Sequence, residues 1–290
     1  MIRLDLGVPP TDVRQALEGR LATALATYDR HGGGDEVKAL TGSGYDVTKP
    51  TLYDRQHKKC AYCERKPGYD GQPVEHFRPK KYAERALPGD PSDRDDDRYW
   101  WLAWTWENLY FACHTCNGRA NKGNRFPLAP GSAILPLPDR PSGGLLSDAS
   151  RDLGGETALL VDPRRVDPLD HIAWVPHDPH LHPSLWQWNI AGLTKVGRAT
   201  IAVLGIDERD DDATDHFLRN IWRRGVERVE ALVRDGDVAA AHGTWGPLIA
   251  DRLDVRQDFR AASWCMLTRM RRRVPLLAAG LAEPARPSVS

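Results

Sequence analysis

The sequence predicts an α+β protein in which a small metal-held domain lies between helical segments. Three observations support this prediction. Apolar residues recur at helical spacing towards both ends of the chain, two Cys-x-x-Cys pairs enclose a central segment, and proline and glycine interrupt that segment repeatedly. With 290 residues the chain can bury one large core and a second, smaller one.

At the N-terminal end, two helices are expected. The first carries apolar residues at helical spacing from Val13 to Tyr28, and the glycines at 32–34 are expected to end it. The second is short and runs from Thr48 to Gln56, with Pro50 in its first turn, where a proline needs no hydrogen-bond donor.

Beyond the cysteine-rich segment, residues 129–155 have the proline, glycine and serine content of a surface connection. Short strands are expected at Thr157–Val161 and His171–Val175, and helices from Thr194 onward. The last helix is expected to carry the apolar residues Val255, Phe259, Ala262, Met266 and Met270.

The predicted division has four parts. Residues 1–47 form an N-terminal helical segment, 48–130 the metal-held domain, 131–193 an irregular connection with short strands, and 194–290 a helical C-terminal domain.

The charge of the chain is balanced overall but segregated locally. Forty Lys and Arg match forty Asp and Glu, which excludes a uniformly basic nucleic-acid coat. The segment from Arg55 to Arg85, however, contains nine basic residues and only four acidic ones. No run of about 18 apolar residues occurs, so no membrane span is predicted. No secretory signal is recognised either, and we expect a cytoplasmic protein.

The two cysteine pairs predict a structural zinc site on Cys60, Cys63, Cys113 and Cys116. Two residues between thiolates allow both sulfurs to face one Zn²⁺ at about 2.3 Å, and two such pairs complete a tetrahedron. The alternatives are four unrelated buried thiols or a redox-active pair. Cys265 is expected in the core of the last helix.

Forty-nine residues separate Cys63 from Cys113, too many for a simple zinc ribbon, and the insert contains Glu75-His76. A glutamate can hold a hard divalent cation, and a histidine can take a proton from an attacking water. Those two functions are what phosphodiester hydrolysis requires. The alternative for an isolated Glu-His pair is an ordinary surface salt-bridge element.

Further motifs follow in a fixed order. Asn108 lies in Trp-x-Asn-Leu, Asn117 directly follows the second cysteine pair, and Lys-Gly-Asn-x-Phe-Pro-Leu ends the segment. This order resembles an HNH endonuclease with a zinc-held ββα-metal core, and in particular the HNH nuclease subunits of Septu-type anti-phage systems and of retrons that use the same pair. The resemblance implies an ABC/SMC-like ATPase as partner and nucleic acid, most simply foreign DNA, as substrate.

The resemblance also implies roles for individual residues. It makes His76 the general base, Asn108 a brace for the loop that presents His76, and Glu75 and Asn117 the protein ligands of a catalytic Mg²⁺ or Mn²⁺. Lys122 departs from the pattern, because many HNH cores have a lysine three residues after Cys-Asn and here it is five. The basic residues expected to contact phosphate are Lys58, Lys59, Arg78, Lys80, Lys81, Arg119 and Lys122.

Several alternatives stay open at this point. An HNH nuclease can cut RNA, including tRNA, instead of DNA, and a zinc core can simply bind nucleic acid or protein without catalysis. A zinc-dependent deaminase would need His-x-Glu and Pro-Cys-x-x-Cys, whereas this chain has Glu-His and Ala-Cys. The tryptophan-rich run 99–106 is expected to fill a core more than to stack on bases. The mixed charges after about Thr194 favour docking of a partner over a phosphate track.

Overall fold

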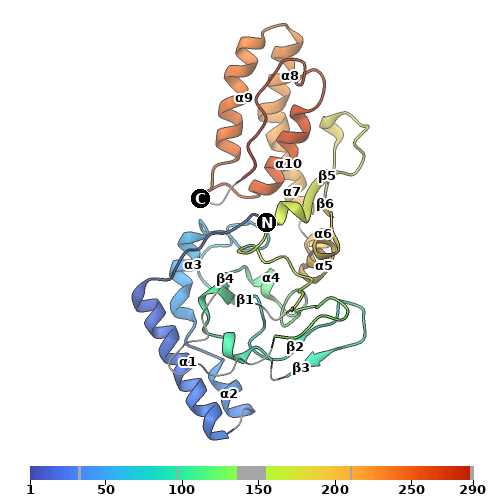
Figure 1. Ribbon diagram of the computed structural model, residues 1–290. Helices are drawn as coiled ribbons and strands as arrows, with labels where there is room; N and C mark the ends of the chain where they lie inside the picture. The colour runs from blue at the N-terminus through green and yellow to red at the C-terminus, as the bar shows by residue number, and fades with distance from the viewer. Residues whose placement is uncertain (32–33, 97, 136–154, 210, 288–290) are drawn as a thin grey trace.

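A computed structural model of the protein describes residues 1–31, 34–96, 98–135, 155–209 and 211–287, except for the side chains of 208–213. It is a mixed protein in which helices accompany three small antiparallel sheets of two strands each. In Figure 1 the N-terminal helices and the first two sheets form one part of the molecule, and the long C-terminal helices project from it. No helix of the described residues is both long and apolar enough to cross a bilayer.

The N-terminal elements confirm both expected helices. Helix α1 spans Thr11–His31 and buries one face, and α2 spans Asp35–Leu40. The 3₁₀ turn η1 (Asp46–Thr48) leads into α3 (Lys49–Arg55), which has proline in its first turn as predicted. The glycines at 32 and 33 lie outside the described residues.

The central segment contains two of the sheets. Strand β1 (Val74–His76) pairs with β4 (Leu109–Phe111), with His76 opposite Leu109. Strand β2 (Ala83–Glu84) pairs with β3 (Arg94–Asp95) to form a hairpin. The 3₁₀ turns η2 (Trp100–Leu102) and η3 (Trp106–Asn108) precede β4. The short helix α4 (His114–Asn117) follows β4 after two residues.

The third sheet pairs β5 (Ile172–Pro176) with β6 (Trp188–Gly192). It confirms a strand close to His171–Val175, whereas β6 was not expected. The strand expected at Thr157–Val161 was wrong. There the backbone forms only a single bridge between Leu128 and Ala158, because other N–H groups of the segment donate elsewhere, that of Val161 to the Thr200 hydroxyl.

The C-terminal region is helical, as expected from Thr194, whose side chain caps the first of these helices. Its elements are α5 (Lys195–Leu204), α6 (Ile206–Arg209), α7 (Asp211–Ile221), the π-helical turn η6 (Trp222–Val226), α8 (Glu227–Arg234), α9 (Val238–Arg252) and α10 (Arg260–Arg271). The short 3₁₀ turns η4 (Pro168–Asp170) and η5 (Pro183–Leu185) flank β5.

The last helix begins later than predicted. Val255 lies outside α10, because Phe259 adopts a left-handed conformation with φ of 49° and therefore cannot continue a helix. Phe259 acts as the N-cap of α10, and Met266 and Met270 lie on its buried face as expected.

Two hydrophobic cores hold these elements together. One packs α1 and α3 against β1, β4 and the tryptophan-rich run, all four of whose tryptophans are buried, which confirms their expected core role. The other joins the four paired cysteines to β5, β6 and the C-terminal helices. The predicted division at 47, 130 and 193 stays a prediction, and residues 136–154 of the expected connection lie outside the described residues.

Candidate active site

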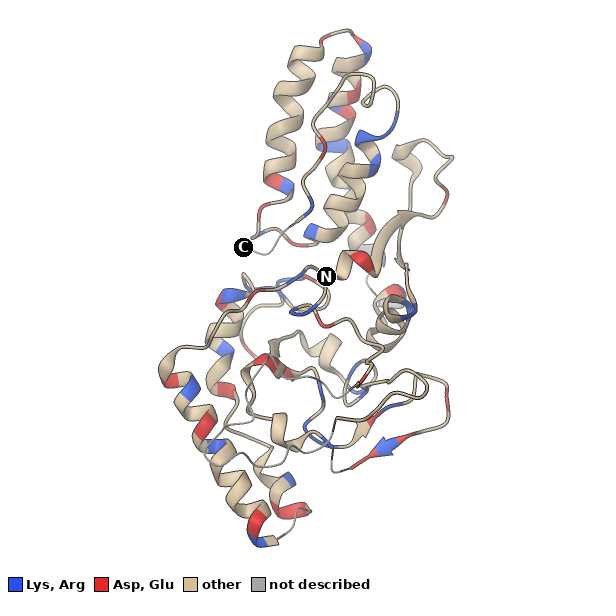
Figure 2. Ribbon diagram, viewed as in Figure 1, with Lys and Arg blue, Asp and Glu red and all other residues tan. Residues whose placement is uncertain are grey.

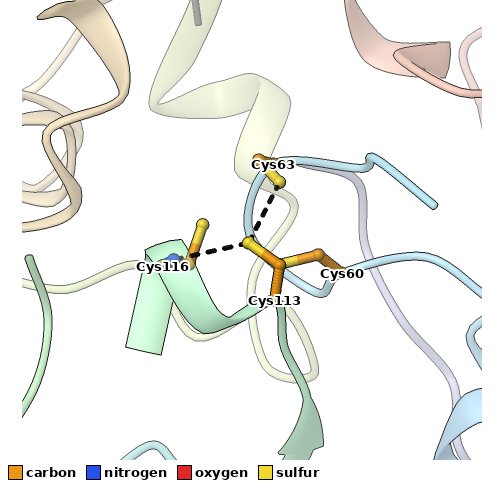
Figure 3. A group of neighbouring side chains, drawn as sticks. All are labelled: Cys60, Cys63, Cys113 and Cys116. Carbon is orange, nitrogen blue, oxygen red and sulfur yellow. Dashed lines mark hydrogen bonds between the residues drawn. The ribbon is translucent and has the colours of Figure 1, made fainter. Parts of the chain in front are cut away.

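The four paired cysteines form one cluster, which Figure 3 shows in close-up. Their sulfur atoms all lie within 4.8 Å of one another and all four side chains are buried. The Cys63 and Cys113 sulfurs are 3.8 Å apart, close to the edge of about 3.8 Å that four Zn–S bonds of about 2.3 Å give in a tetrahedron. The cluster can therefore hold a structural zinc ion.

Local hydrogen bonds prepare this cluster for a cation. The backbone N–H of Cys116 donates to the Cys113 sulfur at 3.3 Å, and that of Tyr62 donates to the Cys60 sulfur at 3.5 Å. Hydrogen bonds from neighbouring thiols hold the pKa of Cys113 well below its usual range and raise the pKa values of Cys63 and Cys116. Zinc binding requires the thiols to lose their protons, and the Cys113 thiol loses its proton most readily.

Two other candidate ligands lie outside the cluster. The side chain of His114, within the second cysteine pair, is exposed. Cys265 lies on α10, and burial raises the pKa of its thiol to about 11, so it stays protonated. Among the described residues, the only group of His, Cys, Asp and Glu that can jointly hold a metal is the four-cysteine set.

Glu75, in the middle of β1, forms a buried ion pair with Lys122. The Lys122 ammonium lies 2.5 Å from the Glu75 carboxylate, and both side chains are almost fully buried. The same ammonium donates to the His76 carbonyl at 2.8 Å, and the Tyr62 hydroxyl lies 3.5 Å from the same Glu75 oxygen. Burial raises the pKa of Glu75, and the lysine offsets part of that rise. Lys122 therefore stabilises the charge of Glu75 in a dry environment.

His76 points to the other side of β1, as alternation along a strand requires. Its Nε2 lies 3.0 Å from the Ala103 carbonyl oxygen, and its ring contacts the Tyr45 ring edge-on at 4.6 Å. Because a carbonyl only accepts, Nε2 carries the proton and Nδ1 has the free lone pair. Burial, together with the nearby Lys80 charge, holds the pKa of His76 well below its usual range. The imidazole is therefore neutral at physiological pH.

Asn108 braces the turn that follows β1. Its side-chain oxygen accepts from the Arg78 backbone N–H at 2.8 Å, and its amide donates to the Arg78 carbonyl at 3.0 Å and the Leu102 carbonyl at 3.1 Å. Its own carbonyl accepts from the Phe77 N–H at 2.9 Å. These four bonds fix the backbone directly after His76.

Asn117 ends α4 and lines a groove of about 470 Å³. We call it the hairpin groove; its lining residues are Tyr82, Glu84, Arg94, Asn117, Arg119, Lys122, Gly123, Asn124 and Arg125. Within the described ranges Asn117 forms no hydrogen bond with Glu75 or His76. Lys122 connects these parts, since it lines the groove and contacts Glu75.

Three of the seven basic residues expected to contact phosphate are buried and paired inside the protein, which argues against that role for them. Lys59 donates to the carbonyls of residues 255 and 257, Arg78 pairs with Glu156 at 2.7 Å, and Lys122 pairs with Glu75. A cation that has lost its water to an internal partner cannot at the same time meet phosphate on the surface.

The remaining four differ in exposure. Lys58 and Arg119 are exposed and Lys81 is partly exposed. Lys80 is partly buried, with its ammonium 3.8 Å from the centroid of the Tyr45 ring, and burial lowers the pKa of this lysine to about 8.

Sequence reasoning missed the contacts made by Tyr45, Tyr62 and Glu156. Tyr62 lies between two predicted zinc ligands, which is a usable signal. Tyr45 and Glu156 lie in segments rich in small and polar residues, where no local pattern marks them.

The four-cysteine cluster beside a small antiparallel sheet defines a protein of helices and small antiparallel sheets with a centre suited to zinc. The Septu protein PtuB of Bacillus mycoides strain KBAB4 is 33% identical to the chain over 121 residues, which is 39% of this chain and 34% of that protein. The chain is thus related to PtuB, although it spans only about a third of the length of the curated relative it matches. No family model and no solved structure matches the chain.

Proposed function

We propose that the protein is a metal-dependent HNH endonuclease that hydrolyses phosphodiester bonds of nucleic acid, most simply DNA. The observation that carries this proposal is the succession of β1, β4 and α4 beside the four-cysteine cluster. This is the order of a zinc-held ββα-metal core. It puts Glu75 and His76 on the first strand and Asn117 on the helix.

In this proposal His76 is the general base. Its neutral imidazole has a free Nδ1, while the Ala103 carbonyl fixes the ring through Nε2. Such a base takes the proton of a water that attacks phosphorus, which contributes roughly 10²–10⁴-fold to the rate. Asn108 keeps the turn after the base in place, and Lys122 fixes the His76 carbonyl from the opposite side.

Glu75 and Asn117 would hold the catalytic cation. Carboxylate and amide oxygens suit Mg²⁺ or Mn²⁺, and the buried Glu75 already attracts one positive charge, that of Lys122. When bound, the metal would stabilise the charge that develops on the scissile phosphate and the leaving oxygen.

The proposal extends to a bacterial anti-phage setting in the cytoplasm with an ABC/SMC-like ATPase as partner. It is supported by the relation to the Septu protein PtuB and by the zero net charge, which gives weak affinity for free nucleic acid. A partner that holds the substrate would remedy that weakness. The C-terminal helices after Thr194 would dock it, since they carry both acidic and basic positions among many uncharged ones in Figure 2.

A second candidate is a non-catalytic zinc-held module that binds nucleic acid or protein. The burial of His76 and the ion pair of Glu75 with Lys122 favour it, because Glu75 and His76 would have such internal partners if they took no part in catalysis. The two candidates differ in whether phosphodiester bonds are broken.

The experiment that separates them incubates purified protein with plasmid DNA, and in parallel with RNA including tRNA, in the presence of Mg²⁺ or Mn²⁺. We expect cleavage that His76→Ala abolishes and that His180→Ala, on an exposed loop, leaves intact. The assay is repeated with a co-expressed ABC/SMC-like ATPase of the kind proposed as partner. Absence of cleavage of every substrate with and without that partner, or equal cleavage by His76→Ala and the parent, contradicts the nuclease.

A further inference from the structure

The hairpin groove is lined by two separate segments of the chain. Tyr82, Glu84 and Arg94 come from the β2–β3 hairpin and the residue before it. Asn117, the last residue of α4, and Arg119 come from the second segment. The groove therefore includes a residue of the proposed metal site, and a ligand held in it would lie next to that site.

Three cations from separate segments gather around one ring at this hairpin. The Arg94 guanidinium lies 4.5 Å from the centroid of the Tyr82 ring, the Lys81 ammonium 5.4 Å and the Lys38 ammonium 5.9 Å. The negative face of an aromatic ring attracts cations but does not neutralise them. Lys38 is paired with Asp35 at 3.6 Å, whereas Lys81 forms no ion pair within the residues that the structure describes.

The acidic residues of the hairpin pair with partners along the hairpin itself, and Asp96 pairs with Arg94 there. Asp93 accepts from Arg85 at 2.6 Å and Asp95 from Arg98 at 2.8 Å. Glu84 accepts from the Ser92 hydroxyl at 2.5 Å and the Asp93 N–H at 2.8 Å. Figure 2 shows acidic and basic positions next to each other along this hairpin.

Two arginines of the groove are exposed to solvent. Arg94 is paired with Asp96, yet 52% of its side chain stays exposed. Arg119 is exposed and forms no ion pair within the part of the chain that the structure describes. Both line the groove, so one strand of a polyanion held there would meet a cation from the hairpin and another from the segment after α4.

We infer that the hairpin groove binds the sugar–phosphate backbone of the nucleic-acid strand that leads into the active site. Arg94 and Arg119, which line the groove, are its phosphate contacts, and Lys81, whose ammonium lies beside the Tyr82 ring, is a flanking contact. This inference rests on the proposed nuclease function and specifies how its substrate is held. Arginine and lysine contacts to phosphate carry no base information. The groove therefore positions the substrate without reading its sequence.

The test measures binding of fluorescent oligonucleotides by anisotropy at several salt concentrations, using protein that carries His76→Ala so that the probe is not consumed. The probes are a DNA single strand, the corresponding duplex and an RNA strand. In this background we compare Arg94→Gln, Lys81→Gln and Arg119→Gln. The matched control is Arg256→Gln, because Arg256 is exposed and pairs with an aspartate two residues away, as Arg94 does, but lies outside the groove.

Each groove variant is expected to weaken binding and to reduce the slope of log K against log salt by roughly 1, the loss of one phosphate contact. The control keeps the affinity and slope of its parent. Equal binding by groove variants and control overturns the inference, as does failure of the parent to bind any of the probes.

The same substitutions in the protein that keeps His76, assayed for cleavage, separate this inference from the proposed function. A rise in KM for nucleic acid with little change in kcat supports the groove, and an unchanged KM overturns it while leaving the nuclease intact. Loss of oligonucleotide binding in the groove variants, in a protein that cleaves nothing, supports the groove and rejects the nuclease.

Discussion

The Lys122 ammonium lies 2.5 Å from the Glu75 carboxylate, and the two side chains expose only 1% and 2% of their surface. The lysine also reaches the His76 carbonyl, and its backbone N–H donates to the Cys116 carbonyl. One residue thus links β1, the second cysteine pair and the hairpin groove. Because water cannot replace a buried partner, this link controls both stability and the charge of the proposed metal site.

We expect Lys122→Met to destabilise the protein by about 3–5 kcal/mol, the usual cost of leaving one partner of a buried ion pair uncompensated. Mg²⁺ or Mn²⁺ should restore part of that loss, because a cation on Glu75 would replace the ammonium. The measurement is urea denaturation with and without the metal. Lys58→Met, at an exposed lysine, serves as control. If Lys122→Met is as stable as the parent, the role of the ion pair is contradicted. If the metal stabilises Lys122→Met and Lys58→Met equally, the metal site is contradicted.

The pH profile of cleavage should reflect the lowered pKa of His76. The base acts in its neutral form, and its pKa lies well below the ordinary value of about 6.5. Activity should therefore stay level as the pH falls to about 6.5, and decline only below that value. Lys80→Gln removes a positive charge that lowers this pKa, so the decline should move to higher pH. Lys58→Gln should not move it. A decline centred above the ordinary value in the parent contradicts the assignment of the base.

Zinc should be part of the folded protein. Elemental analysis is expected to find about one tightly held zinc per chain, lost in Cys60→Ser and kept in Cys265→Ser. Structural zinc contributes about 10–16 kcal/mol of binding free energy in small domains, as much as the whole stability of a typical domain. Cys60→Ser should therefore lose cooperative unfolding.

Loss of zinc should also destabilise the segment before α10 in the C-terminal region. Lys59, next to the first zinc ligand, donates to the carbonyl of Val255 at 2.7 Å. Hydrogen exchange between residues 253 and 259 should accelerate without the metal. A Cys60→Ser protein that keeps its zinc and melts like the parent would refute the site.

Patterns within short stretches of the sequence predicted the parts of the fold that neighbouring residues determine. The cysteine spacing predicted the cluster, and apolar periodicity predicted α1 and the helices after Thr194. Helix α9 lies within the region expected to be helical, but no apolar pattern indicated its own bounds. It contains Gly243, Gly246 and Pro247, which disfavour a helix, and the buried Trp245 packs it against the core.

The contacts around the candidate site could not be predicted in the same way. Glu156 reaches Arg78 across 78 positions, and Lys122 reaches the His76 carbonyl across 46. A basic run in the sequence does not reveal which of its members the fold will bury. The exposed Arg119 and the buried Lys122 are three residues apart, yet only the fold distinguishes them.

Arg78 provides the last prediction, because the sequence assigns it to phosphate and the structure to the interior. Its partner Glu156 also accepts from the Tyr99 hydroxyl at 2.6 Å and the Leu135 N–H at 3.0 Å. Arg78→Met should therefore cost about 3–5 kcal/mol in urea denaturation, and Arg78→Met with Glu156→Leu should recover part of it, since no buried charge is left. The exposed pair offers the control, because Arg94→Gln should cost at most about 1 kcal/mol. If Arg78→Met keeps the parental stability but lowers the salt dependence of oligonucleotide binding, the residue contacts phosphate and its buried role is wrong.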